Sequence, residues 1–185
     1  MPIKPLSLPS QPRYSPAMDI RPASSSDLPR LHPIIERAYR GDTARQSWAI
    51  ASAPPASPRT SIAALEAILA SPAERLLVAL GTDGAPIGCV QISDRGDGRA
   101  YLGLLCVDPG LQSGGLGHRL IAAAEQLAAT AFGARQMEMT VISTHDKLIQ
   151  YYQRRGYHPT GEHRPYPVPL DPPQQMIVLA KALAA

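Results

Sequence analysis

Apolar residues recur along the chain with two different spacings, and these spacings separate the expected helices from the expected strands. A helical repeat of leucine, isoleucine and alanine runs from Leu28 to Ala38, directly after a Ser26-Asp27 pair that is suited to capping a helix. The same repeat predicts further helices over residues 61–70, 116–131 and 146–155. Residues 51–59, between the first two helices, are rich in proline, alanine and serine and predict a loop.

Shorter apolar runs predict six strands, over residues 18–22, 75–80, 87–93, 99–107, 136–142 and 174–180. Turns rich in glycine and aspartate join the second, third and fourth runs, which is typical of an antiparallel meander. The 99–107 run is apolar on both faces, as in a central strand, and the five prolines of 165–173 predict a loop. The order β-α-α-β-β-β-α-β-α-β predicts an α/β (mixed α+β) fold whose mixed, mostly antiparallel sheet carries helices on both faces.

Composition sets the domain organisation and excludes several function classes. The chain has 185 residues, and we expect one domain over 18–185 after a flexible tail of residues 1–17, which holds five prolines. A net charge of +3 without a basic run gives no indication of nucleic-acid binding. Cys89 and Cys106 lie in apolar runs and are interpreted as buried thiols, not as a disulfide or a metal pair. No apolar run reaches membrane-spanning length, so we expect a cytoplasmic protein without membrane contact. We also expect no metal site.

A glycine-rich loop between the 99–107 strand and the 116–131 helix carries the chemistry. A helix start leaves backbone N–H groups unpaired at the positive end of the helix dipole, and glycines at 114, 115 and 117 leave that backbone accessible. The loop is therefore suited to a phosphate or pyrophosphate. It is not a Walker loop, because His118 follows Gly117, and it is not a Rossmann loop, because Leu120 stands where the third glycine is needed.

The remaining pattern, Gln112-x-x-Gly115-x-Gly117 after a Leu105-x-Val107 strand end, resembles the acetyl-CoA signature of the GCN5-related N-acetyltransferase (GNAT) superfamily. Residues 145–157 resemble the last block of that family, a helix that ends in aromatic-x-x-x-Gly156-aromatic. The resemblance extends from Met18 to the C-terminus and is greatest to an uncharacterised-type bacterial subgroup. It implies the GNAT fold and transfer of an acetyl group from acetyl-CoA to a primary amine of a small molecule or peptide. The transfer would be a direct attack in a ternary complex, and a homodimer is allowed.

The resemblance also implies roles for individual residues. Tyr152, four residues before Gly156, takes the position of the general acid. Tyr151 is also a tyrosine and helical spacing does not separate the two, and the alternative role of Tyr152 is to pack the helix against the sheet. The base is left open, because the 99–107 strand has no carboxylate; the candidates are Glu138, Glu162, His145 and a water chain. The implied cofactor contacts are Leu105, Cys106, Val107, Gln112, Ser113, Gly114, Gly115, Leu116, Gly117, His118, His145 and Tyr152.

The expected substrate side is formed by the first two helices, the loop between them and the loop before the last strand. Its candidate residues are Tyr39, Trp48, Arg59 and Tyr166. In the resembling subgroup a Thr-Glu pair follows the tryptophan, where this chain has Ala49-Ile50. The absence of a glutamate from the 99–107 strand keeps open a second hypothesis, a catalytically silent CoA-binding sensor or structural module.

Overall fold

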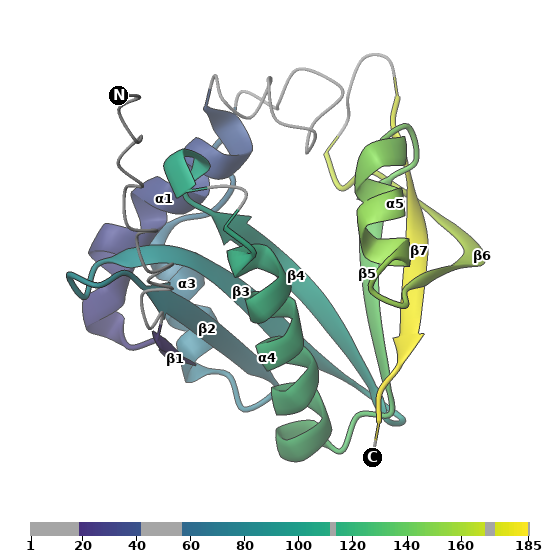
Figure 1. Cartoon of the computed structure of the whole chain (residues 1–185), viewed down its shortest axis with the longest axis horizontal. Coiled ribbons are helices and arrows are strands. Elements are labelled where there is room, and N and C mark those ends of the chain that lie inside the picture. The colour runs from purple at the N-terminus through teal and green to yellow at the C-terminus, as the bar shows by residue number, and fades with distance from the viewer. Residues whose placement is uncertain (1–18, 42–56, 112–113, 169–172, 185) are drawn as a thin grey trace, which may run out of the picture.

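A computed structural model describes residues 19–41, 57–111, 114–168 and 173–184. Within these ranges four helices and seven strands are connected by short turns (Figure 1). The helices are α1 (Leu28–Arg40), α3 (Ile62–Ala70), α4 (Leu116–Phe132) and α5 (Asp146–Gln153). The strands are β1 (Asp19–Pro22), β2 (Glu74–Leu80), β3 (Pro86–Gly96), β4 (Arg99–Val107), β5 (Gln136–Ile142), β6 (His158–Pro165) and β7 (Gln175–Ala182).

All seven strands form one sheet in the order β1-β2-β3-β4-β5-β7-β6. The β4–β5 pair is parallel and every other pair is antiparallel, so the sheet is mixed and mostly antiparallel. Helices α1 and α3 pack on one face over a core that includes Leu31, Ile35 and Leu65. Helices α4 and α5 pack on the other face, where Leu120 and Tyr152 join a second core. The predicted fold class, with helices on both faces, is confirmed.

Strand β6 was not predicted, because its sequence has no apolar repeat. Its residues are mostly exposed, and it lies at the edge of the sheet, where it pairs only with β7. Prolines at its second and last positions suit an edge strand, and the pairing is interrupted between Pro159 and His163, around Gly161. An edge strand that faces solvent buries too little for hydrophobic patterning to reveal it. The expected loop therefore begins only after Pro165.

The contact between β4 and β5 is short and ends where β4 is distorted. Paired residues extend only from Arg99 with Gln136 to Tyr101 with Glu138. Further along β4 the pairing with β3 shifts by one residue, and Leu104 adopts a positive φ of 47°. This bulge turns the side chains over: Leu102 belongs to the core beneath α4, whereas Leu104 belongs to the core beneath α1. Figure 1 shows β4 and β5 close together near the C-terminus and far apart at their other ends.

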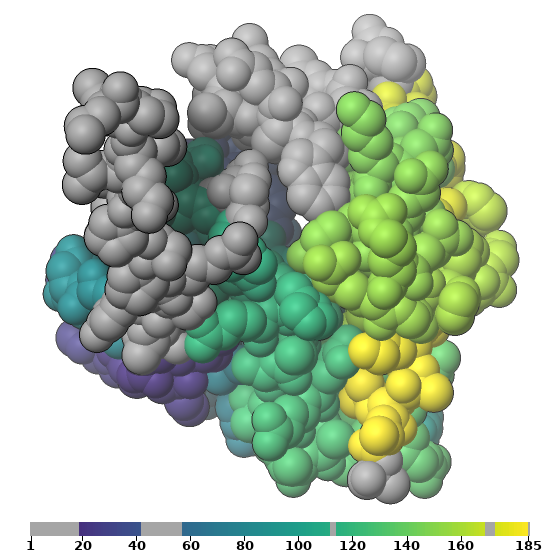
Figure 2. Space-filling view, in the orientation of Figure 1, coloured from purple at the N-terminus to yellow at the C-terminus, as the bar shows by residue number. Residues whose placement is uncertain are grey.

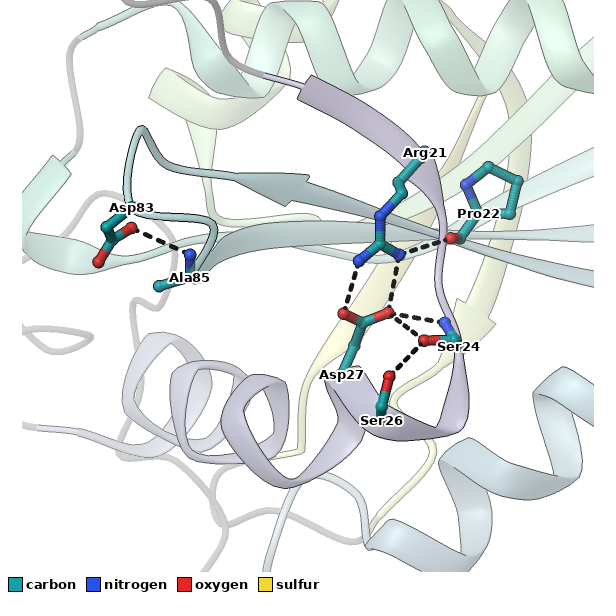
Figure 3. Close-up of polar contacts among 7 residues, drawn as sticks. All are labelled: Arg21, Pro22, Ser24, Ser26, Asp27, Asp83 and Ala85. Carbon is teal, nitrogen blue, oxygen red and sulfur yellow. Dashed lines mark hydrogen bonds and ion pairs between the residues drawn. The ribbon is translucent and has the colours of Figure 1, made fainter.

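The first strand is fastened to α1 through Asp27 (Figure 3). Asp27, from the predicted Ser26-Asp27 pair, is the N-cap residue of α1, but its side chain does not cap this helix and a short 3-10 turn, Ser25–Asp27, precedes it. The Asp27 carboxylate instead accepts two hydrogen bonds of 2.8 Å from the Arg21 guanidinium and two more from the backbone N–H and hydroxyl of Ser24. The Arg21 contacts hold the pKa of Asp27 well below its usual range, with help from Ser24 and against the effect of burial.

Candidate active site

A cavity of about 770 Å³ lies where β4 and β5 diverge. Residues from both faces of the sheet line it, with α1 on one face and α4 and α5 on the other. Figure 2 shows the face of the molecule on which α4 and α5 lie next to each other. The predicted residues that line it are Leu105, Cys106, Val107, Gly115, Leu116, Gly117, His145, Tyr152, Tyr39, Arg59 and Tyr166. Gly114 and His118 are described but are not part of the lining. Gln112, Ser113 and Trp48 lie outside the described residues.

The glycine-rich loop forms one wall of this cavity. Gly115 is the residue before the first turn of α4 and adopts a left-handed conformation, with φ 76°. Space around its Cα is open, because a Cβ there would meet no described atom within 4 Å. The first backbone N–H groups of α4 have no acceptor within the helix, and the first intrahelical bond at this end is from Arg119 N–H to the Gly115 carbonyl, at 3.2 Å. Accessible N–H groups at the positive end of a 17-residue helix suit a phosphate group.

Tyr152 is buried at the centre of the site, with 8% of its surface exposed. Its ring packs edge-on against Tyr151 and Tyr157, at centroid distances of 5.3 Å and 6.0 Å. Tyr157 is itself fixed by a 2.8 Å hydrogen bond to Glu125. Burial raises the pKa of Tyr152, and the neighbouring Tyr151 adds to the effect. Tyr152 is therefore a neutral phenol at physiological pH, held in one position, which is the state that a proton donor requires.

Tyr151 occupies a different part of the site. A Cβ added at Gly117 would lie 3.2 Å from the Tyr151 hydroxyl oxygen, so this tyrosine reaches the first turn of α4. The Arg155 guanidinium carbon lies 3.3 Å from the centroid of its ring, and Arg155 also donates a 2.8 Å hydrogen bond to the Tyr151 carbonyl. Burial raises the pKa of Tyr151, and the charges of Arg155 and Arg154 oppose that rise. The two adjacent tyrosines are thus separated, with Tyr151 at the loop and Tyr152 in the core.

The two glutamates predicted as bases are not part of the cavity lining. Glu138 lies between Arg99 and Arg164, at 3.9 Å and 3.8 Å, with 14% of its side chain exposed. Glu162 lies on the edge strand β6, more than half exposed, and pairs with Arg164 at 2.7 Å. A hydrogen bond from Arg164 lowers the pKa of Glu162. Both carboxylates are engaged in ion pairs outside the cavity, and their position gives the base assignment no support.

His145 is the third candidate base, and it does line the cavity. It is the residue before the first turn of α5, and its side chain is buried. Burial lowers the pKa of His145, so its imidazole is neutral at physiological pH. It lies at a helix start beside the cavity, and its contact with the cofactor stays a prediction.

The substrate side of the cavity is organised around Tyr39 at the end of α1. Its hydroxyl donates a 2.8 Å hydrogen bond to the carbonyl of Leu105, just beyond the bulge in β4. The guanidinium of Arg59 lies 4.9 Å from the centroid of the Tyr39 ring. Burial raises the pKa of Tyr39, which keeps its hydroxyl a donor. Tyr39 therefore links α1 to the strand segment on which the thioester end of the cofactor was expected.

One carboxylate that the sequence reasoning did not select does line the cavity. Glu74, the first residue of β2, accepts a 2.8 Å hydrogen bond from the Gln91 side chain and a 2.7 Å bond from the Ser93 hydroxyl. The available signal was the pair of polar residues Gln91 and Ser93, which alternate with apolar residues in the predicted 87–93 strand. Their relation to Glu74 depends on the β2–β3 register, which connects residues distant in sequence.

Within the described ranges, no group of three or more histidine, cysteine, aspartate or glutamate residues is arranged to hold a metal ion. None of the helices in the described part of the chain is long and apolar enough to cross a membrane.

Comparison with known proteins gives a family match and a set of similar structures. Residues 37–157 match the sequence profile of the Acetyltransferase (GNAT) family. The fold is similar to that of Salmonella typhimurium yncA, solved with its cofactor acetyl-CoA, at a TM-score of 0.68 and 19% identity, covering 92% of this chain and 96% of that one. It is also similar to the Escherichia coli ribosomal-protein-S18-alanine N-acetyltransferase, at a TM-score of 0.70 and 18% identity, covering 91% and 95%. No sequence among the curated proteins matches.

Proposed function

Since the chain belongs to the GNAT family of acetyltransferases, we propose that it transfers the acetyl group of acetyl-CoA to a primary amine of a small molecule or peptide. The observation that carries the proposal is the cavity between β4 and β5, which joins the open helix start of α4 to the buried phenol of Tyr152. A phosphate-binding loop and a neutral acid within one cavity are the two groups that a CoA thioester requires at its opposite ends.

The residues present fit acetyl-CoA as the donor substrate. Gly115 leaves the first turn of α4 accessible, and a side chain there would take up space beside the helix N–H groups; at Gly117 a Cβ would instead lie 3.2 Å from the Tyr151 hydroxyl oxygen. Beyond the bulge, Leu105 and Val107 line the cavity where β4 no longer pairs with β5, so a pantetheine has room to lie along this segment of the strand. The loop would hold the pyrophosphate, and β4 would align the thioester.

Direct transfer needs one bond to form and one to break. The lone pair of the amine attacks the thioester carbonyl, and the carbon–sulfur bond then breaks to release the acetylated amine. Tyr152 donates its phenolic proton to the departing sulfur and regains a proton from the nitrogen through solvent. Cys106 takes no part as an acyl carrier, since it is buried and lies 3.5 Å from the Cys89 sulfur. Glu138 and Glu162 have no part in the proposed steps.

Paired variants test this proposal through the release of free CoA with a panel of amines. Tyr152→Phe keeps the ring packing and removes the proton, so turnover should fall by a factor of roughly 10²–10⁴ with little change in acetyl-CoA affinity. Tyr151→Phe is the matched control on the adjacent residue, and its turnover should stay close to wild type. A silent CoA-binding module would instead bind acetyl-CoA and release no CoA with any amine. Loss of turnover in Tyr151→Phe alone would transfer the acid role to Tyr151.

A further inference from the structure

We infer that the end of the cavity formed by Glu74, Gln91, Ser93, Tyr101 and Gly103 is a recognition subsite for a second, protonated amino group of the acceptor. All five residues line the cavity. The inference rests on the proposed acetyl transfer for the position of the reacting amine. It adds the chemical class of the acceptor, which is a linear amine with a second ammonium group distant from the first.

Strand register builds this subsite from three neighbouring strands. Glu74 of β2 pairs with Ser93 of β3, and Ser93 pairs in turn with Tyr101 of β4. Gln91, two residues before Ser93, pairs with Gly103, two residues after Tyr101. Residues directly opposite each other on paired strands project from the same face of the sheet. The five residues therefore share one face, the face that α1 and α3 cover further along.

The polarity of the subsite selects a hydrogen-bond donor. Both bonds from Gln91 and Ser93 go to the same oxygen of Glu74, Oε2, and no described residue donates to its other oxygen, Oε1. The amide oxygen of Gln91 lies 3.7 Å from the position of a Cβ on Gly103, so it borders the space above that glycine. Glu74 is the only carboxylate among the described residues that line the cavity. The Oε1 atom of Glu74 and the amide oxygen of Gln91 are both acceptors, and together with the charge of the carboxylate they favour an ammonium group.

Gly103 lets the Tyr101 ring and the Gln91 amide oxygen lie close together over β4. A Cβ at this position would lie 3.3 Å from a ring carbon of Tyr101 and 3.7 Å from the Gln91 amide oxygen, so a side chain there would displace the groups that border the subsite. Glycine in the interior of a strand often marks a bulge or a close approach by a ligand, and Gly103 lies next to the bulge of β4. The Tyr101 hydroxyl is fixed at 2.6 Å from the Thr140 hydroxyl, and Arg95 lies over the Tyr101 ring at 4.9 Å. Arg95 also lines the cavity, and the described contacts of the Glu74 carboxylate are with Gln91 and Ser93.

The strand geometry sets the length of the acceptor. Glu74 lies two strands across the sheet from Tyr101, and Leu105 lies four residues further along β4. With strands about 4.8 Å apart and a rise of about 3.3 Å per residue, roughly 16 Å separates the backbones of Glu74 and Leu105. The glutamate side chain spans part of this distance, and an extended diaminooctane spans much of the rest. Diaminobutane is too short to reach Glu74 from the proposed thioester position.

Initial rates at saturating acetyl-CoA test the subsite with octylamine, diaminooctane and diaminobutane. For the wild type we expect kcat/KM for diaminooctane to exceed kcat/KM for octylamine by about tenfold or more, because diaminooctane makes one additional charge-assisted hydrogen bond. For diaminobutane, kcat/KM should be low. In Glu74→Gln the ratio of kcat/KM for diaminooctane to kcat/KM for octylamine should fall to near one, mainly through a higher KM for diaminooctane, because the charged partner of the second ammonium group is lost. Glu66→Gln, an exposed glutamate of α3, is the matched control and should keep the wild-type preference.

Two outcomes would overturn the subsite and leave acetyl transfer standing. One is equal use of octylamine and diaminooctane by the wild type, and the other is an unchanged preference in Glu74→Gln. If no amine is acetylated, the proposed function fails, and titration calorimetry of diaminooctane still tests the subsite. Binding that the wild type and Glu66→Gln show and Glu74→Gln loses supports it. Absent binding, or equal binding by all three proteins, overturns it.

Discussion

Gly115 provides a sharp test of the loop, because the chain contains a matched glycine remote from the cavity. Gly115 has φ 76° and Gly84, in the turn between β2 and β3, has φ 72°, and a Cβ at either would meet no described atom within 4 Å. Only Gly115 lines the cavity. Replacement by alanine therefore imposes the same backbone strain at both positions but places a methyl group beside the helix start at only one.

The expected magnitudes follow from that comparison. A non-glycine residue in the left-handed region costs about 1–2 kcal/mol, so both variants should unfold a few degrees below wild type, by about 2–8 °C for a chain of this size. Gly115→Ala should also lose hydrogen bonds between helix N–H groups and phosphate, each worth about 1.5–3 kcal/mol, and bind acetyl-CoA roughly 10–100-fold more weakly. Gly84→Ala should bind acetyl-CoA as wild type does.

Thermal unfolding with and without acetyl-CoA, together with titration calorimetry, measures both effects. A ligand that binds only the native state stabilises it by an amount that grows with the logarithm of its affinity, so at one acetyl-CoA concentration the shift in melting temperature should shrink in Gly115→Ala alone. Wild-type affinity in Gly115→Ala, with the expected loss of stability, would refute the assignment of the loop to the pyrophosphate. Equal loss of affinity in both variants would show that strain, and not access to the helix start, controls binding.

Three further predictions follow from contacts elsewhere. Asp27→Asn should lower the free energy of unfolding by about 2 kcal/mol at neutral pH. Because the pKa of Asp27 in the folded protein lies below its ordinary 3.8, this difference from wild type should be complete above pH 3.8 and should shrink as the pH falls below it. A difference in urea unfolding that stays constant with pH would contradict this. Glu138→Gln should change turnover by less than about threefold, since general-base loss costs far more, and a larger fall in CoA release would restore the base assignment. Cys89 should react with iodoacetamide far more slowly in the native protein than in urea, because its contact with Cys106 and its burial raise the pKa of its thiol. Equal reaction rates, followed by mass spectrometry, would show that the Cys89 thiol is accessible in the native protein.

Local patterns predicted most of the fold. The bounds of β4 and β5 agree with the predicted 99–107 and 136–142, because long apolar runs ended by turns are visible in sequence. The start of α4 at Leu116 was also predicted, since the loop glycines mark it. β6 was missed because an exposed edge strand needs no apolar residues.

The site was harder to predict because it depends on contacts between distant segments. Tyr151 and Tyr152 are adjacent, and helical periodicity does not distinguish them; only the packing against Tyr157 and the contact with Gly117 do. The bulge at Leu104 leaves no sequence signal, yet it decides which side chains of β4 face each core. The group around Glu74 exists only through the register of three strands. The acid role of Tyr152 itself stays a prediction.

The central claim is transfer of an acetyl group to an amine within this cavity, and product analysis by mass spectrometry tests it most directly. Purified protein is incubated with acetyl-CoA and octylamine, and free CoA, acetylated amine and intact protein mass are measured together. Direct transfer predicts equal amounts of free CoA and N-acetyloctylamine, formed far more slowly by Tyr152→Phe, and an intact protein that gains no acetyl group from acetyl-CoA alone. Binding of acetyl-CoA without any acetylated amine, across octylamine and the diamines alike, would contradict the claim.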